Sequence, residues 1–209
     1  MRPRLHLGAL QRPAMRRLLG IRARLAAHAI PPSLSEAREL ALCVIEAQNA
    51  WAMYMRYFFV SCMLGAKTVH GARITQAVGE IASELEAITY AKTIVPGSMP
   101  TGPMSEPQWH SSKTMLTLAD KAQLSNLTQI QVAYSVVGRA LDDLPKARNF
   151  FAHRSMHSAM VLGGVRKRYG LPKTVRPGLI PAQRHPTEPH TIAHAWVEEL
   201  IRRMKLLPM

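Results

Sequence analysis

Apolar residues recur at intervals of three and four along most of the chain, which is the spacing of one face of a helix. The clearest run lies between residues 33 and 64, where Ser33 and Glu36 have the spacing of a capping box and Gly65 follows as a stop. Its apolar stripe comprises Leu40, Ala41, Val44, Trp51, Met55, Phe58 and Cys62. The pattern predicts one long helix over residues 33–64.

Further runs with the same period predict helices over residues 72–93, 112–124, 125–140 and 146–162. A Pro- and Gly-rich segment separates the first of these from the rest, and Trp109 directly after it is expected to be buried. No alternating run is long enough to predict a strand. The expected fold class is all-α, an antiparallel bundle of four to five helices.

Charge is spread unevenly along the chain. The formal net charge is +14 at pH 7, of which residues 1–30 carry +7 with no acidic side chain. Residues 31–138 carry −1 and residues 139–209 carry +8. A polyanion is the natural partner for cationic ends, although solvated tails would have the same composition.

These patterns together suggest three parts. We expect a poorly ordered basic N-terminal arm over residues 1–32 and the helical bundle over 33–164. A basic, Pro-rich segment with a C-terminal extension helix would then occupy 165–209. The extension helix is predicted over 190–206, with an apolar side that docks on the bundle or on a second protomer.

Cysteine use and hydropathy favour a cytoplasmic protein with no membrane association. Cys43 and Cys62 fall at apolar helical positions without zinc-like spacing, as reduced core residues do. The apolar run over residues 57–66 is about ten residues long, too short to cross a bilayer.

No metal or cofactor is predicted. The histidines near the C-terminus, His185, His190 and His194, have spacings that could suit a metal, but no Cys stands near them and no metal-site motif is formed. The chain also has no Gly-rich phosphate loop and no nucleophile elbow.

The candidate site is the segment Arg148-Asn149-Phe150-Phe151-Ala152-His153. The planar guanidinium of arginine donates paired hydrogen bonds to phosphate oxygens, and the histidine side chain gains or loses a proton near neutral pH. In this composition an Arg five residues before a His is expected about once by chance, and an Asn directly after the Arg lowers that to about one in a hundred. The residue types are those needed to cut a phosphodiester without a metal ion.

The surrounding residues favour a helix here. Asp143 is a candidate N-cap, Pro145 suits the first turn, and Gly163-Gly164 supplies a stop. Phe150 and Phe151 are expected to point mostly into the core.

Four-residue spacing on this helix would place Asn149, His153 and His157 on one face. Arg148 lies about 140° around the axis from His153 and would reach sideways along the surface.

The segment Leu144 to Arg154 resembles the signature of HEPN domains, helical bundles found in many prokaryotic ribonucleases and defence toxins. The resemblance covers this motif and the helical body over 33–163. It implies that two protomers bring their motifs to one cleft and cut RNA without metal, leaving a cyclic phosphate. Carried onto this chain, it implies phosphate binding by Arg148, acid–base chemistry by His153 and a polar holding role for Asn149.

Basic residues after the motif are further candidates for RNA binding. Arg154 and His157 follow it directly, and Arg166-Lys167-Arg168 forms a cluster beside one aromatic residue. None of them belongs to the signature, and a solvated turn is an equal alternative for the cluster.

The resemblance implies a metal-independent endoribonuclease, a homodimer, and a role as a toxin or phage-defence effector with an antitoxin as a further partner. Three alternatives stay open. The Arg and His could hydrogen-bond across a helix pair as a structural contact. The protein could be a non-catalytic nucleic-acid-binding or accessory helical protein, or a helical subunit whose basic ends dock an acidic protein.

Overall fold

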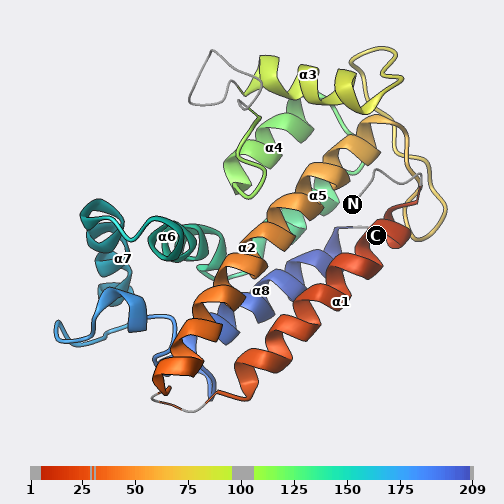
Figure 1. Ribbon diagram of the computed structural model, residues 1–209. Helices are drawn as coiled ribbons and strands as arrows, with labels where there is room; N and C mark the ends of the chain where they lie inside the picture. The colour runs from red at the N-terminus through yellow and green to blue at the C-terminus, as the bar shows by residue number, and fades with distance from the viewer. Residues whose placement is uncertain (1–5, 29, 31, 96–105, 208–209) are drawn as a thin grey trace. The chain divides into compact units, whose positions relative to one another are not determined.

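The computed structural model describes residues 6–207 apart from 29, 31 and 96–105, and no strand occurs within these ranges. The helices are α1 (Leu7–Ala26), α2 (Leu34–Met63), α3 (Glu84–Ile94), α4 (Ser112–Lys121), α5 (Leu127–Ser135), α6 (Ala140–His153), α7 (Met156–Arg168) and α8 (Ile192–Leu206), with a 3-10 turn, η1 (Pro177–Leu179), before α8 (Figure 1). The all-α prediction is confirmed, with eight α-helices in the described chain instead of four to five and an extension. None of the helices described is both long and apolar enough to cross a bilayer.

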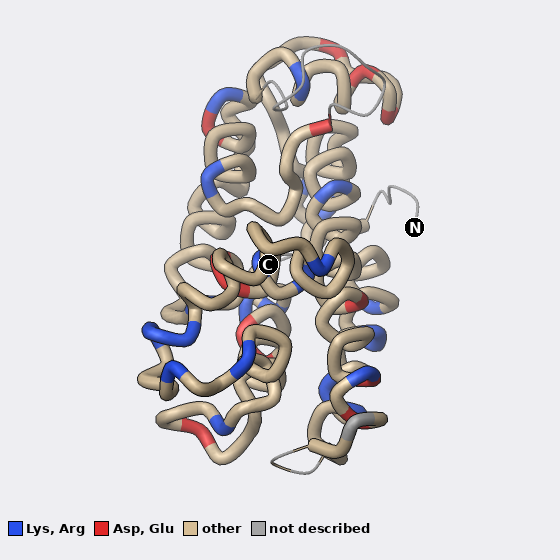
Figure 2. The backbone as a smooth tube through the Cα atoms, turned by 60° about the vertical axis from the view of Figure 1, so that its left-hand side comes forward, with Lys and Arg blue, Asp and Glu red and all other residues tan. Residues whose placement is uncertain are grey.

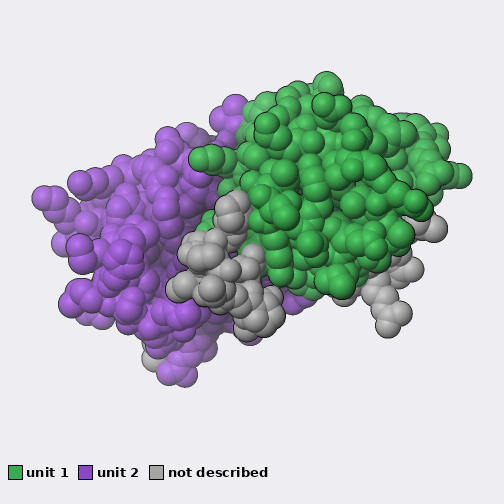
Figure 3. Space-filling model, turned by 90° about the horizontal axis from the view of Figure 1, so that it is seen from above, with its two compact units in different colours: residues 1–16, 51–136, 202–209 green, residues 17–50, 137–201 purple. Residues whose placement is uncertain are grey.

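The chain forms two compact units, shown in separate colours in Figure 3. Unit 1 comprises residues 1–16, 51–136 and 202–209, and unit 2 comprises residues 17–50 and 137–201. Helices α1, α2 and α8 therefore contribute residues to both units. The candidate motif belongs to unit 2.

The long helix predicted over 33–64 is present as α2. Its N-terminus has the predicted capping box, because the Ser33 hydroxyl accepts from the Glu36 amide at 3.3 Å and the Glu36 carboxylate accepts from the Ser33 amide at 2.7 Å. The capping box supplies local partners for two backbone amides that the helix itself leaves unpaired.

The basic N-terminus differs from the prediction. Residues 7–26, expected within a poorly ordered arm, form α1 with Pro13 inside the helix. Apolar side chains at helical spacing along α1 are buried, namely Leu7, Leu10, Ala14, Leu18, Ile21 and Leu25. Burial of this stripe stabilises the helix despite the proline and the seven arginines of residues 1–30.

The helix predicted over 72–93 is shorter than expected. Its first part is irregular, because backbone amides there bond to distant segments: Ile74 donates to the Ala66 carbonyl at 2.9 Å and Ala77 to the Ala122 carbonyl at 3.0 Å. Helix α3 begins only after Ser83, whose hydroxyl accepts from the Glu86 amide. The apolar spacing in this stretch reflects burial of a loop, as at Ile74.

Aromatic side chains of α2 form the core of unit 1. Trp51, Tyr54, Phe58 and Phe59 are all at most 1% exposed. The Phe59 ring lies 5.8 Å from the Trp109 ring, centroid to centroid, and Trp109 is buried as predicted. Burial of these large rings removes much apolar surface from water and stabilises this core.

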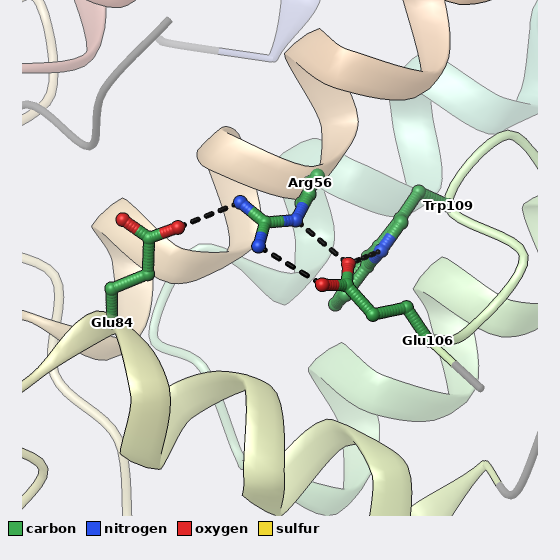
Figure 4. A network of polar contacts seen from close by, with 4 residues as sticks. All are labelled: Arg56, Glu84, Glu106 and Trp109. Carbon is green, nitrogen blue, oxygen red and sulfur yellow. Dashed lines mark hydrogen bonds and ion pairs between the residues drawn. The ribbon is translucent and has the colours of Figure 1, made fainter. Parts of the chain in front are cut away.

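A cluster of polar residues joins three segments of unit 1 (Figure 4). The Arg56 guanidinium on α2 contacts the Glu84 carboxylate at 2.7 Å and donates to both oxygens of Glu106 at 2.7 and 3.0 Å. The Trp109 indole N–H also donates to Glu106, at 2.8 Å. The cluster connects α2 to the start of α3 and to the segment before α4.

Both cysteines are buried and unpaired, Cys43 in unit 2 and Cys62 in unit 1, as predicted. Burial raises the pKa of Cys43 to about 11 and that of Cys62 to about 12. Both are therefore protonated thiols at neutral pH and poor nucleophiles.

The C-terminal helix predicted over 190–206 is present as α8, and its apolar side is buried within the chain. In unit 2 the Trp196 indole N–H on α8 donates to the Tyr169 hydroxyl at 2.7 Å. In unit 1 the buried Arg203 guanidinium donates to the carbonyls of Ala133, Tyr134 and Val136 at 3.0, 3.1 and 2.6 Å. Arg203 therefore satisfies carbonyls that the end of α5 leaves without helical partners.

Candidate functional site

The motif helix α6 begins earlier than predicted. Asp143 is not an N-cap and Pro145 is not in the first turn, because α6 starts at Ala140 and both residues lie inside it. The N-cap residue makes no side-chain cap bond. The buried Glu199 carboxylate on α8 instead accepts a hydrogen bond from the Ala140 amide at 2.8 Å. A distant carboxylate thus takes the place of a local cap and also suits the positive end of the helix.

Gly138 makes this cap possible. A Cβ atom built on Gly138 would stand 1.9 Å from Oε2 of Glu199 and 2.8 Å from its Cγ. Any side chain here would therefore displace the carboxylate from the start of α6. Residues on α8 and in the preceding turn thus position the motif helix.

Asp143 anchors α6 to α7. Its carboxylate is fully buried and lies 2.6 Å from Nη2 of Arg168 and 3.6 Å from Nζ of Lys146. Burial raises the pKa of Asp143, and the Arg168 and Lys146 charges oppose that rise. The ion pair links the first turn of α6 to the last turn of α7, two helices that pack on each other.

The motif helix also ends earlier than predicted. It stops at His153, because Arg154 adopts the left-handed conformation with φ of 46°. Ser155 then caps α7 through a reciprocal pair of hydrogen bonds with Ser158. The expected stop at Gly163-Gly164 is wrong, since both glycines lie inside α7.

This break separates residues that were expected to share a face. Asn149 and His153 are both exposed and stand four residues apart on α6. His157 is also exposed but belongs to the first turn of α7, so its predicted place on the same helical face is wrong.

Arg148 is half-buried, and its Nη1 donates to Oδ1 of Asn149 at 3.2 Å. The Asn149 amide oxygen thus orients the guanidinium through one N–H group, and the remaining N–H groups can still donate to a ligand. The His153 ring is open to solvent at the end of the helix. The motif therefore presents a cation, an amide and an imidazole at the surface of unit 2.

The predicted basic cluster is only partly available to a ligand, because two of its three cations have partners in the fold. Figure 2 marks the Lys and Arg positions of the described chain in blue. Arg166 donates to the Lys173 carbonyl at 2.6 Å, and Arg168 is paired with Asp143. Lys167 is exposed and makes no side-chain hydrogen bond or ion pair in the described structure. Arg154 is exposed as well, immediately after the motif.

Among the described residues, no group of three or more His, Cys, Asp or Glu side chains gathers in a way that could hold a metal ion. The His190 and His194 rings lie 4.0 Å apart, centroid to centroid, and burial lowers the pKa of His194. They form a ring contact, and no third ligand joins them.

Two positioning residues had no local signal in the sequence. Glu199 and Gly138 are 61 positions apart in the chain, and their contact appears only in the folded structure. The break at Arg154 did have a signal, the Ser155 and Ser158 pair, but neither proline nor glycine marks it.

No family model matches the chain, and no curated protein or solved structure does so either. The candidate function therefore rests on the residues of α6 and its neighbours.

Proposed function

We propose that the protein is a metal-independent endoribonuclease of the HEPN type. The observation that carries the proposal is the surface placement of the motif, with Arg148 oriented by Asn149 and the His153 ring open to solvent at the end of α6. A phosphate bound by Arg148 would be accessible from outside unit 2, as a polymeric substrate requires.

The chemistry follows from the side chains. His153 takes the proton of a ribose 2′-hydroxyl, whose oxygen attacks the adjacent phosphorus. The bond from phosphorus to the 5′-oxygen breaks, leaving a 2′,3′-cyclic phosphate and a 5′-hydroxyl. Arg148 stabilises the charge on the phosphorane, and His153 of a second copy or a water protonates the departing oxygen. The required 2′-hydroxyl restricts the reaction to RNA.

We infer that a second copy of the chain docks next to the motif. Met156 and Met160 on α7 are 81% and 71% exposed and lie one turn apart. Exposed apolar side chains of this size support a homodimer that brings two motifs together. A cytoplasmic toxin or phage-defence effector restrained by an antitoxin is the biological setting that the HEPN resemblance implies.

The test is cleavage of single-stranded RNA in the presence of EDTA. We expect the parent to cut, His153→Ala to lose activity by about 100-fold or more, and Arg148→Ala to lose about 100- to 1,000-fold. Matched controls are His70→Ala and Arg184→Ala, which remove the same groups at exposed positions outside the motif. DNA of the same sequence should stay intact. Cleavage at the parent rate by both motif variants would refute the assignment.

Non-catalytic nucleic-acid binding is the second candidate, and the charge of +8 over residues 139–209 favours it. This function would hold if RNA is retained in a salt-dependent manner while no preparation cuts it.

A further inference from the structure

A groove in unit 2 lies directly beside the motif. It has a volume of about 720 Å³ and is bordered by the start of α2, the end of α6, α7 and η1. Phe150 and Phe151, which stand between Asn149 and His153 in the chain, form part of its wall. These two rings were expected to point into the core, but they are only half-buried. The volume lies in the range of sites that take small organic groups.

The wall of the groove is apolar and aromatic. The rings of Phe150 and Phe151 lie 5.5 Å apart, centroid to centroid, at an angle of 63°. Leu179 and alanines of α2 and α7 also line the groove. Gly178 lets η1 approach the rings, because a Cβ there would stand 3.1 Å from Cε1 of Phe150. A flat aromatic group is the ligand type that such a wall accommodates.

The rim of the groove is cationic. Arg38, Arg154 and Arg176 line it, and no acidic residue does. None of the three guanidinium groups has a hydrogen-bond or ion-pair partner among the described residues, whereas Arg166 and Arg168 nearby are both engaged. Unpaired guanidinium groups around an apolar wall complement a ligand that is aromatic in the middle and anionic at its edges.

We propose that this groove binds one nucleotide of single-stranded RNA next to the scissile phosphate. The base stacks on the Phe150 and Phe151 wall, and the flanking phosphates contact Arg38, Arg154 and Arg176. The inference rests on the proposed function for its choice of RNA as ligand. Apart from the three arginines, no side chain that lines the groove can hydrogen-bond to the edge of a base. The groove therefore holds bases by stacking and discriminates weakly among them.

The experiment measures binding of the full chain to a labelled single-stranded RNA by fluorescence anisotropy. His153→Ala serves as the parent, so that the RNA is not consumed. A second ligand is a ribose-phosphate chain of the same length without bases. Added variants are Phe151→Ala, which removes a stacking ring, Ala41→Leu, which fills the groove from α2, and Arg176→Ala. Arg184→Ala is the matched control, an exposed arginine that does not line the groove.

We expect Phe151→Ala and Ala41→Leu each to weaken RNA binding about 5- to 100-fold and to leave binding of the base-free chain unchanged. Arg176→Ala should weaken the binding of both ligands. Arg184→Ala should weaken the binding of each ligand less than Arg176→Ala does. Because Ala41→Leu removes no contact, it separates a blocked groove from a destabilised protein.

RNA binding at the parent level by both Phe151→Ala and Ala41→Leu would overturn the proposal. A change in the oligomeric state of these variants with unchanged RNA affinity would also overturn it and would assign the groove to a second copy of the chain. A groove that is occupied by an acidic peptide and not by RNA would overturn it as well. The two proposals fail separately. If RNA binding depends on the groove but no RNA is cleaved, the groove proposal stands and the nuclease proposal is refuted. If cleavage depends on His153 but groove variants bind RNA normally, the nuclease proposal stands and the groove proposal is refuted.

Discussion

Arg168 and Arg154 show how burial and pairing decide the role of a side chain that composition alone cannot assign. Both were candidates for RNA binding. Arg168 is held by the buried Asp143, while Arg154 is exposed on the rim of the groove. An arginine that is paired within the fold would have to break that ion pair in order to bind a phosphate. The arginines available to a ligand are therefore those without a partner.

The Arg56 cluster leads to a prediction about acid stability. The hydrogen bond from Arg56 is the main cause that lowers the pKa of Glu106 below its ordinary value of 4.5, with Trp109 adding to it. Near this pKa the native state therefore binds fewer protons than the unfolded state. The contribution of Glu106 to the free energy of unfolding is complete above pH 4.5 and is lost as the pH falls through the lowered pKa. Glu106→Gln should cost about 1 to 2 kcal/mol at pH 7 and much less under acid.

Urea unfolding of parent and variant at several pH values measures this difference. Glu80→Gln is the control, because Glu80 is an exposed carboxylate of the same unit outside the cluster. A Glu106→Gln penalty that stays constant from neutral pH into acid would contradict the assignment.

Elements with local signals were predicted well. Helix α2 follows from its capping box and apolar period, and α8 follows from its buried stripe. The start of α3 had a usable signal in Ser83 and Glu86, but apolar spacing before it favoured a longer helix. Helix α1 was missed because proline and arginine content outweighed its apolar stripe.

The motif helix was harder to predict because its ends depend on contacts far away in the chain. Its start is capped by Glu199, which approaches only because residue 138 is glycine. Its end is a left-handed arginine, a conformation that side chains rarely favour. The residue types of the motif were visible in the sequence, whereas the groove beside it required the fold.

Gly138→Ala tests how α6 is positioned. The new methyl group would displace the Glu199 carboxylate and leave the Ala140 amide without that partner, so we expect a loss of about 2 to 4 kcal/mol in the free energy of unfolding. Urea unfolding measures the loss. Gly163→Ala is the control, because nothing lies within 4 Å of its Cβ and helix propensity alone should stabilise it by up to about 1 kcal/mol. Equal stability of Gly138→Ala and the parent would exclude this steric role.

At the scale of the whole molecule, net charge is the main determinant of which partners the protein attracts. A charge of +14 predicts attraction to any polyanion, so affinity for RNA by itself does not identify a site. What distinguishes a site is the number of phosphates that it contacts, which the salt dependence of binding counts.

We expect RNA affinity of the His153→Ala protein to fall steeply with salt. If Arg148 and the three rim arginines contact about four phosphates, affinity should drop about 50-fold for a fourfold rise in salt. Replacing Arg38 and Arg176 together by Ala should reduce the logarithmic slope by about one to two. Anisotropy titrations across a KCl series provide the slopes. An unchanged slope in the double variant would place the phosphate contacts elsewhere on the protein.

Arg154 carries a cost that its position explains. Glycine adopts its left-handed backbone conformation freely, whereas a residue with a Cβ pays about 1 to 2 kcal/mol there. A designer who sought only thermostability would choose Arg154→Gly, and the groove would then lose one of its three cations. If the groove binds RNA as proposed, thermal stability and affinity for the anionic ligand would compete at this one position.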